Sequence, residues 1–234
     1  MTQRPVVVLL GAGMGGRGVA QALAPAAHLV IVDVALPPAQ AACDLAIAQG
    51  GTAEPAVVNL TSLQSVQQFC AELLEKHGRV DAVVHLVGGW RGSATVNEDS
   101  IEQFNELLPG IVTTVQTTTV AFREALLTSP HGRYVMVTST SVQNPRKEYA
   151  AYAAAKAAAE AWVRATGDAF EESPARACIV AVSSLVDQAM RDANPVKTFS
   201  SATDTIELGR AIDSLLTDPD LMNGAYVDLT IDQA

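Results

Sequence analysis

The stretch PVVVLLGAGMGGRG, residues 5–18, decides the fold of this chain. Within it, Gly11, Gly13 and Gly16 form a G-x-G-x-x-G pattern between a predicted strand and a predicted helix. The first glycine of such a pattern permits a tight turn, the second lets the backbone approach a pyrophosphate, and the third allows close helix packing. The helix start adds N–H donors for phosphates. The residues expected at the phosphates are Gly11, Gly13, Met14, Gly15 and Gly16.

Apolar β-rich runs and helix patterns alternate along the whole chain. The predicted strands are residues 5–10, 28–33, 55–59, 80–87, 133–139, 175–182 and 225–230. The predicted helices are residues 15–24, 38–49, 62–77, 98–128, 147–170 and 204–217. This alternation predicts an α/β doubly wound Rossmann domain over residues 1–234, with a parallel sheet of about seven strands and helices on both faces. Pro109–Gly110 is expected to bend the longest helix, and residues 183–203 are a candidate lid or binding loop.

Asp33 ends the second predicted strand, where an acidic side chain completes a dinucleotide-binding pattern. Its carboxylate can accept hydrogen bonds from both hydroxyls of an adenosine ribose. We therefore expect NAD(H) to be preferred. Arg17 leaves NADP(H) open, because a guanidinium on the first helix turn could meet a 2′-phosphate.

A second group of polar residues follows the fifth predicted strand. Ser139, Thr140 and Ser141 lie at its carboxyl end, where open α/β sheets bind ligands. In the alanine-rich run EYAAYAAAKAAAEAW, residues 148–162, Tyr152 and Lys156 are four residues apart and share one helix face. Taken alone, this pair fits an ordinary helix as well as a reactive site.

The glycine loop, Asp33, Ser139, and Tyr152 with Lys156 together resemble the short-chain dehydrogenase/reductase family, in the same order over essentially the whole chain. The resemblance implies that Tyr152 exchanges a proton with the substrate oxygen and that Ser139 hydrogen-bonds that oxygen. Lys156 would hold the nicotinamide ribose and lower the pKa of the phenol. The resemblance also implies hydride transfer between NAD(P) and a small carbonyl or alcohol. Further implied cofactor contacts are Asn59, Leu60, Val87 and Gly88.

The chain departs from the family pattern at several positions. Leu10 replaces a threonine of the usual glycine loop, and Leu107 stands near the position of an asparagine that relays protons in many members. The usual Asn-Asn-Ala-Gly reads His85–Leu86–Val87–Gly88, and Ser183–Ser184 replace Pro-Gly. Because the relay asparagine is missing, a catalytically silent dinucleotide-binding sensor or scaffold remains an alternative.

Gly88–Gly89–Trp90 resembles the dihydropteridine reductase branch of this family. That branch acts on a planar heterocycle, which is a further alternative for the substrate. Trp90, Thr140 and Ser141 are the residues expected to contact a substrate. An ordinary packed aromatic is the other interpretation of Trp90.

Composition excludes several other classes. The net charge is −10 and no basic patch is evident, so we expect no nucleic-acid partner. No apolar run has membrane-spanning length and no signal peptide is recognised, so we expect a cytoplasmic protein without a membrane partner. The three cysteines suggest reduced thiols, and the four histidines show no metal-ligand spacing, so no metal is expected. Small residues on the helix at 147–170 favour a homodimer or homotetramer.

Overall fold

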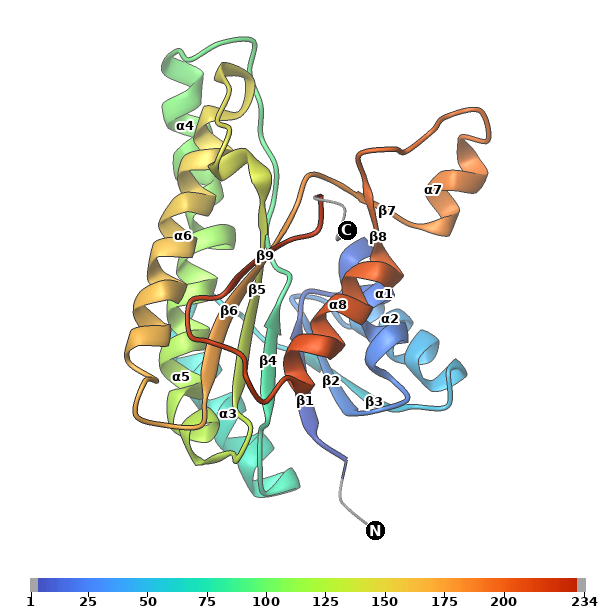
Figure 1. Ribbon diagram of the computed structural model, residues 1–234, viewed down its shortest axis with the longest axis vertical. Helices are drawn as coiled ribbons and strands as arrows, with labels where there is room; N and C mark the ends of the chain where they lie inside the picture. The colour runs from blue at the N-terminus through green and yellow to red at the C-terminus, as the bar shows by residue number, and fades with distance from the viewer. Residues whose placement is uncertain (1–3, 231–234) are drawn as a thin grey trace.

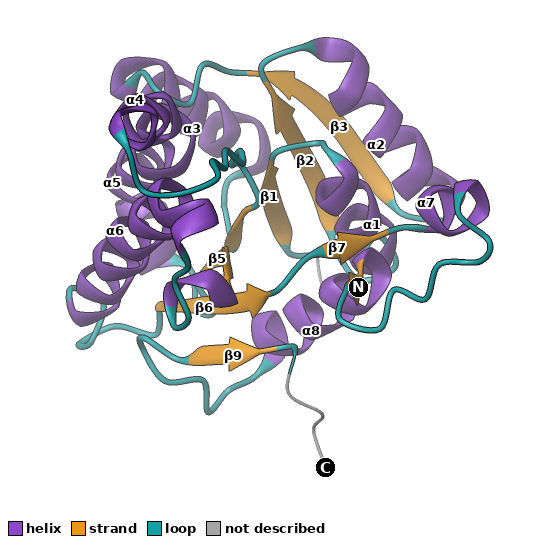
Figure 2. Ribbon diagram, turned by 90° about the horizontal axis from the view of Figure 1, so that it is seen from above, coloured by secondary structure: helices purple, strands orange, loops and turns teal. Residues whose placement is uncertain are grey.

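The computed structural model describes residues 4–230, and seven parallel strands form its main sheet. The strands are β1 (Val6–Leu10), β2 (His28–Asp33), β3 (Thr52–Val57), β4 (Ala82–His85), β5 (Arg133–Ser139), β6 (Arg176–Val182) and β9 (Tyr226–Asp228). Their order across the sheet is β3-β2-β1-β4-β5-β6-β9. The order reverses between β1 and β4, and ligands of such sheets bind beyond the carboxyl ends of the strands at this point. Figure 2 looks at the molecule from above.

Helices cover both faces of the sheet (Figure 1). One face carries α3 (Leu63–His77), α4 (Glu98–Leu108), α5 (Thr114–Thr128) and α6 (Ala150–Asp168). The other face carries α1 (Met14–Leu23), α2 (Leu36–Ala48) and α8 (Thr205–Thr217). The predicted doubly wound α/β fold is therefore confirmed.

Alternation along the strands explains the two hydrophobic cores. In β1, Val6, Val8 and Leu10 pack in the core beneath α3, α5 and α6, because alternate side chains of a strand share a face. Val7 and Leu9 point the other way, into the core beneath α1, α2 and α8. Such strands are apolar throughout, as expected for a parallel sheet buried on both sides.

The edge strand β3 differs from its prediction. It spans Thr52–Val57 instead of residues 55–59, so Pro55 lies inside it, opposite Ile31 of β2. A proline has no N–H to donate and is tolerated in a strand at the edge of a sheet. The polar, partly exposed sequence TAEPAV carries little of the apolar signal that identified the buried strands.

The predicted helix at 98–128 is interrupted. A π-helical turn at Pro109–Thr113 separates α4 from α5, which agrees with the bend expected at Pro109–Gly110. The predicted loop at 183–203 has structure of its own: β7 (Leu185–Val186) and α7 (Gln188–Ala193), with β8 (Thr203–Asp204) pairing back to β7. Short 3₁₀ turns at Thr140–Val142 and Lys147–Tyr149 precede α6. No described helix is long and apolar enough to cross a membrane.

Candidate active site

A cavity of about 570 Å³ lies beyond the carboxyl ends of the central strands. The glycine loop forms one wall, the end of β5 and the start of α6 form the opposite wall, and the segment after β6 borders it. Twelve of the predicted site residues line it: Gly11, Gly13, Met14, Gly15, Gly16, Gly88, Trp90, Ser139, Thr140, Ser141, Tyr152 and Lys156. The fold therefore brings the two predicted groups of residues to one cavity.

The glycine loop has the geometry that its sequence requires. Gly11 has φ +100°, a conformation that favours glycine. A Cβ atom on Gly16 would lie 1.9 Å from the carbonyl oxygen of Gly11, so only glycine lets α1 start this close to the turn. A Cβ on Gly13 would meet no heavy atom within 4 Å, because that position faces open space. Gly16 thus allows close packing of α1, and Gly13 leaves open space in front of the loop.

Asp33 lies beside the loop and does not line the cavity. Its Oδ2 accepts a hydrogen bond of 3.0 Å from the backbone N–H of Ala12, and Oδ1 accepts one of 2.8 Å from Val34. The carboxylate therefore ties the end of β2 to the glycine loop. Arg17, the competing cation, lies 3.8 Å from Asp187 of the segment after β6. This ion pair turns the guanidinium toward Asp187.

The chemical wall of the cavity is made of side chains from β5 and α6. Ser139 is the last residue of β5, and its hydroxyl accepts a hydrogen bond of 3.2 Å from the N–H of Ser141. Lys156 is buried, and its ammonium donates a hydrogen bond of 2.9 Å to the carbonyl oxygen of Val137. Tyr152 lies one helical turn before Lys156 and is partly exposed to the cavity. Serine, tyrosine and lysine therefore face the same space.

Burial dominates the electrostatics of this wall. It raises the pKa of the Tyr152 phenol above its ordinary value, and the hydrogen bond with Ser139 opposes the rise only in part. The ammonium of Lys156 donates to Val137, and its predicted effect on the phenol's pKa stays a prediction. Burial also lowers the pKa of Lys156 to about 8, while the neighbouring carboxylate of Glu160 acts in the opposite direction. In the protein alone, the Tyr152 phenol is therefore protonated at neutral pH.

Glu160 is a buried polar residue that the sequence analysis did not single out. It lies on α6 one turn beyond Lys156 and accepts a hydrogen bond of 2.8 Å from Thr138 of β5. Arg164 approaches its other oxygen at 3.6 Å. Burial raises the pKa of Glu160, and these two partners oppose the rise. Tyr152, Lys156 and Glu160 follow one another at intervals of four residues and so share one helix face. This spacing was the sequence signal that could have identified Glu160.

His85, in place of the family's first asparagine, is fully enclosed at the end of β4. Its Nε2 lies 3.0 Å from the hydroxyl of Thr114, which in turn donates to the carbonyl oxygen of Gly110 in the π-helical turn. Burial, with a smaller effect of the Lys156 charge, lowers the pKa of His85 to about 3, so the ring is neutral. Leu107 is buried next to Gly89 and offers no polar group to a relay.

The mouth of the cavity carries groups suited to a ligand. Trp90 is 62% exposed, which excludes the interpretation as an ordinary packed aromatic. The Ser141 hydroxyl oxygen is buried and has no hydrogen-bond partner within residues 4–230, so it is available to a bound molecule. Tyr149, which was not among the predicted site residues, also lines this cavity, from the 3₁₀ turn before α6.

Besides Asp33, three predicted cofactor residues do not line the cavity. The side-chain oxygen Oδ1 of Asn59 accepts hydrogen bonds from the backbone N–H and the hydroxyl of Thr61. The residue borders a different hollow, between β3 and α3. Leu60 is buried, and its backbone oxygen accepts a bond from Thr117. Val87 packs against the core, with its backbone against Gly11. Their predicted contacts with a cofactor stay predictions.

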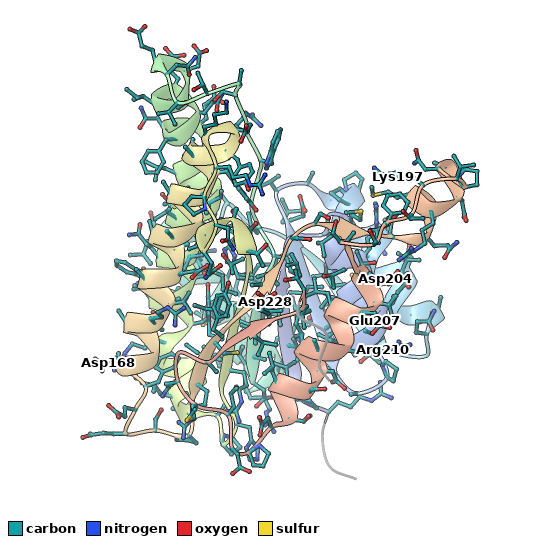
Figure 3. The ribbon with its side chains drawn as sticks, turned by 45° about the horizontal axis from the view of Figure 1, so that its top comes forward. Asp168, Lys197, Asp204, Glu207, Arg210 and Asp228 are labelled. Carbon is teal, nitrogen blue, oxygen red and sulfur yellow. The ribbon has the colours of Figure 1, made fainter. Side chains whose placement is uncertain are left out.

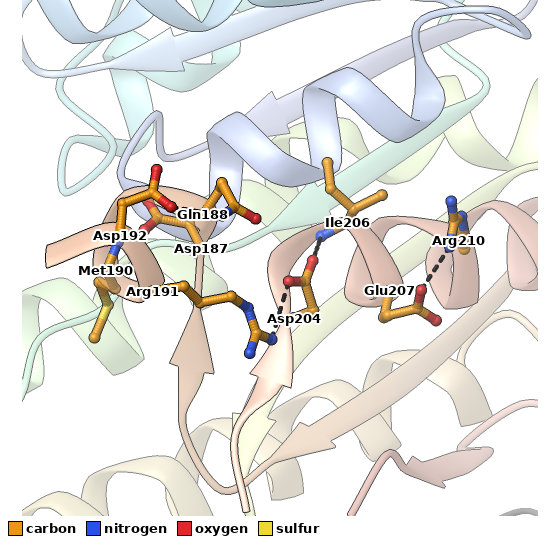
Figure 4. Close-up of polar contacts among 9 residues, drawn as sticks. All are labelled: Asp187, Gln188, Met190, Arg191, Asp192, Asp204, Ile206, Glu207 and Arg210. Atoms are coloured by element: carbon orange, nitrogen blue, oxygen red, sulfur yellow. Dashed lines mark hydrogen bonds and ion pairs between the residues drawn. The ribbon is translucent and has the colours of Figure 1, made fainter. Parts of the chain in front are cut away.

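The segment after β6 is ordered by ion pairs and caps. Asp204 accepts a bond of 2.8 Å from the N–H of Ile206 at the start of α8, and its other oxygen lies 3.3 Å from Arg191 of α7 (Figure 4). Figure 3 shows Lys197 on the projecting part of this segment, with Glu207 and Arg210 along α8. Ser183 and Ser184 line the cavity from the base of the segment. The start of the range 183–203 therefore lies at the cavity, and its role as a lid or binding loop stays a prediction.

Comparison with known proteins gives one family. The sequence profile described as short chain dehydrogenase matches residues 5–195. Among curated proteins no match is found. A solved short chain dehydrogenase from Mycobacterium smegmatis is 24% identical with a TM-score of 0.81, over 99% of this chain and 94% of that one. A short-chain type dehydrogenase/reductase from Mycobacterium ulcerans is 17% identical with a TM-score of 0.86, over 97% of this chain and 88% of that one. At these identities, the structures show a shared fold.

Proposed function

The chain belongs to the short-chain dehydrogenase family of oxidoreductases, and from this membership we propose that its cavity binds NAD(H) and transfers hydride to or from a small carbonyl or alcohol. One observation carries the proposal: Ser139, Tyr152 and Lys156 face the same cavity as the glycine loop. A phosphate-binding wall and a proton-transferring wall on one space are what such a reaction requires.

The residues of the glycine wall fit a dinucleotide. Gly13 leaves room for a pyrophosphate, and the N-terminus of α1 supplies N–H groups and positive dipole. On the other wall, the Lys156 ammonium lies within reach of Gly88, since a Cβ there would be 3.6 Å from Nζ. Lys156 can therefore hold the ribose hydroxyls next to the nicotinamide. The dinucleotide supplies hydride chemistry, which no amino-acid side chain provides.

The proton moves through Tyr152. In carbonyl reduction, the protonated phenol donates to the developing alkoxide, and the Ser139 hydroxyl hydrogen-bonds the same oxygen. The raised pKa of Tyr152 keeps this donor protonated at neutral pH. In the reverse direction, the phenolate must form first, and a bound cationic cofactor together with Lys156 would favour it. Thr138 and Glu160 hold the strand and helix that carry these groups together.

We assign NADH as the preferred cofactor. Asp33 faces the loop at the end of β2, where a ribose 2′-phosphate would bring like charges together. Arg17 is paired with Asp187, which reduces its availability for that phosphate. NADPH remains the second ligand to compare.

Two measurements test the proposal. Fluorescence titration compares binding of NADH and NADPH, and a panel of carbonyl compounds, including planar heterocycles of the dihydropteridine type, tests for net consumption of NADH. Binding with turnover is the expected result. Binding without turnover on any compound would favour the silent sensor or scaffold, which the apolar Leu107 in place of a relay residue makes a real alternative. No binding of either dinucleotide would contradict the proposal.

A homo-oligomer is proposed on the basis of α6. Ala154, Ala158 and Ala161 are exposed, while Ala151, Ala155 and Ala159 pack on the sheet. The small residues that face outward would let a helix of a second copy approach closely. Light scattering at micromolar concentration should give a dimer or tetramer, and a monomer would remove this part of the proposal.

A further inference from the structure

Two histidines and a glutamate gather at the edge of the sheet farthest from β9. His28 begins β2, Glu54 lies on β3, and His77 is the last residue of α3. Their ligand atoms all lie within 4.8 Å of one another. Within residues 4–230, this is the one group of three or more potential metal ligands with that property.

The strand register explains why the three side chains meet. His28 is directly opposite Thr52, and Glu54 follows Thr52 by two residues on the same strand. Alternate residues of a strand point to one face, so His28, Thr52 and Glu54 all point to the face that α3 covers. His77 reaches this face because α3 ends there, at Gly78 with φ +76°. The arrangement depends on pairing between distant segments, so spacing in the sequence could not reveal it.

The orientation of His28 resembles that of a metal ligand. Its Nδ1 lies 3.0 Å from the Thr52 hydroxyl, which can accept a hydrogen bond from the ring. Its Nε2 is buried, has no hydrogen-bond partner within residues 4–230, and lies 3.6 Å from Glu54 Oε1. Histidines that bind metals commonly donate their other ring N–H to a nearby oxygen in this way, which leaves a lone pair for the ion.

Glu54 divides its two oxygens between different partners. Oε1 lies 2.6 Å from His77 Nε2, on the side of the two imidazoles, while Oε2 pairs with the ammonium of Lys76. Oε2 is thus held by an exposed side chain, while Oε1 is directed at both rings.

We propose that His28, Glu54 and His77 bind a divalent transition-metal ion of the zinc type, with a water molecule in the fourth position. Two imidazoles and one carboxylate form a donor set that zinc uses in proteins, with bonds of about 2.0–2.2 Å. Tetrahedral geometry at these bond lengths separates neighbouring ligand atoms by about 3.3 Å. The 3.6 Å between His28 Nε2 and Glu54 Oε1 is close to this value, and His77 would need to move outward from its 2.6 Å contact.

Such an ion would be structural in effect. It would link β2, β3 and the end of α3 at the amino ends of the strands, whereas the candidate active site lies at the carboxyl ends. The competing arrangement has no metal, and Lys76 and His77 share Glu54 between them. Lys76 is 60% exposed, so its side chain can turn to solvent when an ion enters.

The test is a titration of the purified full chain, stripped with chelator, using Co²⁺ followed by visible absorption and Zn²⁺ followed by equilibrium dialysis. We expect one ion per chain and the absorption bands of tetrahedral Co²⁺. Saturating Zn²⁺ at about 100 times its dissociation constant should raise the melting temperature by about 5–10 °C. His77→Gln and Glu54→Gln should each remove the stoichiometric site.

The matched control is His131→Gln, which removes an exposed histidine elsewhere and should leave the titration unchanged. Thr52→Val keeps a good strand residue and removes the hydroxyl opposite His28, so it should weaken binding by about 10–100-fold. Circular dichroism in chelator establishes that each variant is folded. No saturable binding by the wild type, unchanged binding in His77→Gln, or equal loss in His131→Gln would overturn the proposal and leave the ion pair.

Discussion

The two walls of the candidate active site differ in the atoms that form them. The glycine loop presents mainly backbone atoms to the cavity, whereas β5 and α6 present the side chains of Ser139, Tyr152 and Lys156. The glycine wall depends on what Gly11, Gly13 and Gly16 lack, because a Cβ would either collide or occupy the space of a phosphate. The chemical wall depends on what Tyr152 and Lys156 carry. A change at Gly16 therefore alters the fold as well as the cavity, whereas a change at Tyr152 can remove a reactive group and leave the fold intact.

The largest expected effect is at the chemical wall. Tyr152→Phe removes one hydroxyl and keeps the ring, so turnover should fall by about 10²-fold or more, the scale of general acid–base catalysis. Folding and NADH binding should persist. Steady-state rates, thermal melts and NADH titration of the same preparation measure all three.

Tyr149→Phe is the matched control, because it removes the same hydroxyl group from a second tyrosine at the cavity. Tyr149 lines the same cavity, and its hydroxyl lies 3.4 Å from the carbonyl oxygen of Asn144. A modest loss is expected, because that hydroxyl donates to the backbone. If Tyr149→Phe lost as much turnover as Tyr152→Phe, the assignment of the proton donor would fail.

At the glycine wall, Gly16→Ala tests the packing of α1 against the turn, and Gly13→Ala tests the space available to a dinucleotide. The Gly16 variant must move α1 or the loop, because its Cβ would lie 1.9 Å from Gly11 O, so it should lose about 1–3 kcal/mol of unfolding free energy and much of its NADH affinity. Gly13→Ala meets no protein atom, so its stability should be unchanged while its affinity falls. Urea melts with NADH titration measure both, and equal stability of the two variants would contradict this division.

A smaller effect is expected where the walls meet the adenosine end. Asp33→Ser removes a carboxylate from the ribose side and should narrow the preference for NADH over NADPH by about tenfold. The dissociation constants of both dinucleotides give this ratio. Tighter binding of NADPH by the wild type would show that Arg17, not Asp33, sets the cofactor preference.

The smallest effects concern pH. The Lys156 ammonium, with a pKa of about 8, is charged below that pH, and charge-assisted hydrogen bonds are the stronger kind. NADH affinity should therefore be constant from pH 6 to 7 and weaken as pH rises through about 8. His85, with a pKa of about 3, stays neutral, so His85→Asn should leave the shape of the profile between pH 5 and 8 unchanged. A change there would make His85 a titrating part of the site.

Local patterns predicted most of the fold and the two walls. Buried strands such as β1 are apolar throughout, and Gly11 to Gly16 report their backbone role directly, so both could be recognised from the sequence. The edge strand β3 was predicted to begin three residues too late, because its signal is pairing with β2, which no local pattern contains. The π-helical turn at Pro109–Thr113 was visible only as an expected bend.

The hydrogen-bond partners of the site residues could not be predicted from the sequence. The side-chain oxygen of Asn59 accepts a hydrogen bond from Thr61, and its contact with a cofactor stays a prediction. Lys156 donates to Val137 and burial raises the pKa of Tyr152, while the effect of Lys156 on the phenol in a cofactor complex stays a prediction. Glu160 and His28 have hydrogen-bond partners, Thr138 and Thr52, that are distant in the sequence. Residue types and their spacing in the sequence identify candidate site residues. The partners of each side chain depend on how distant segments pack together in the fold.

Pro55 in β3 has a consequence for how the protein behaves in concentrated solution. An exposed edge strand is a template on which a second chain can add its own strand and begin to aggregate. Pro55 has no N–H to offer to an added strand. A chain that pairs with this edge would therefore lack one hydrogen bond. The proline thus limits the growth of the sheet by strands from other chains.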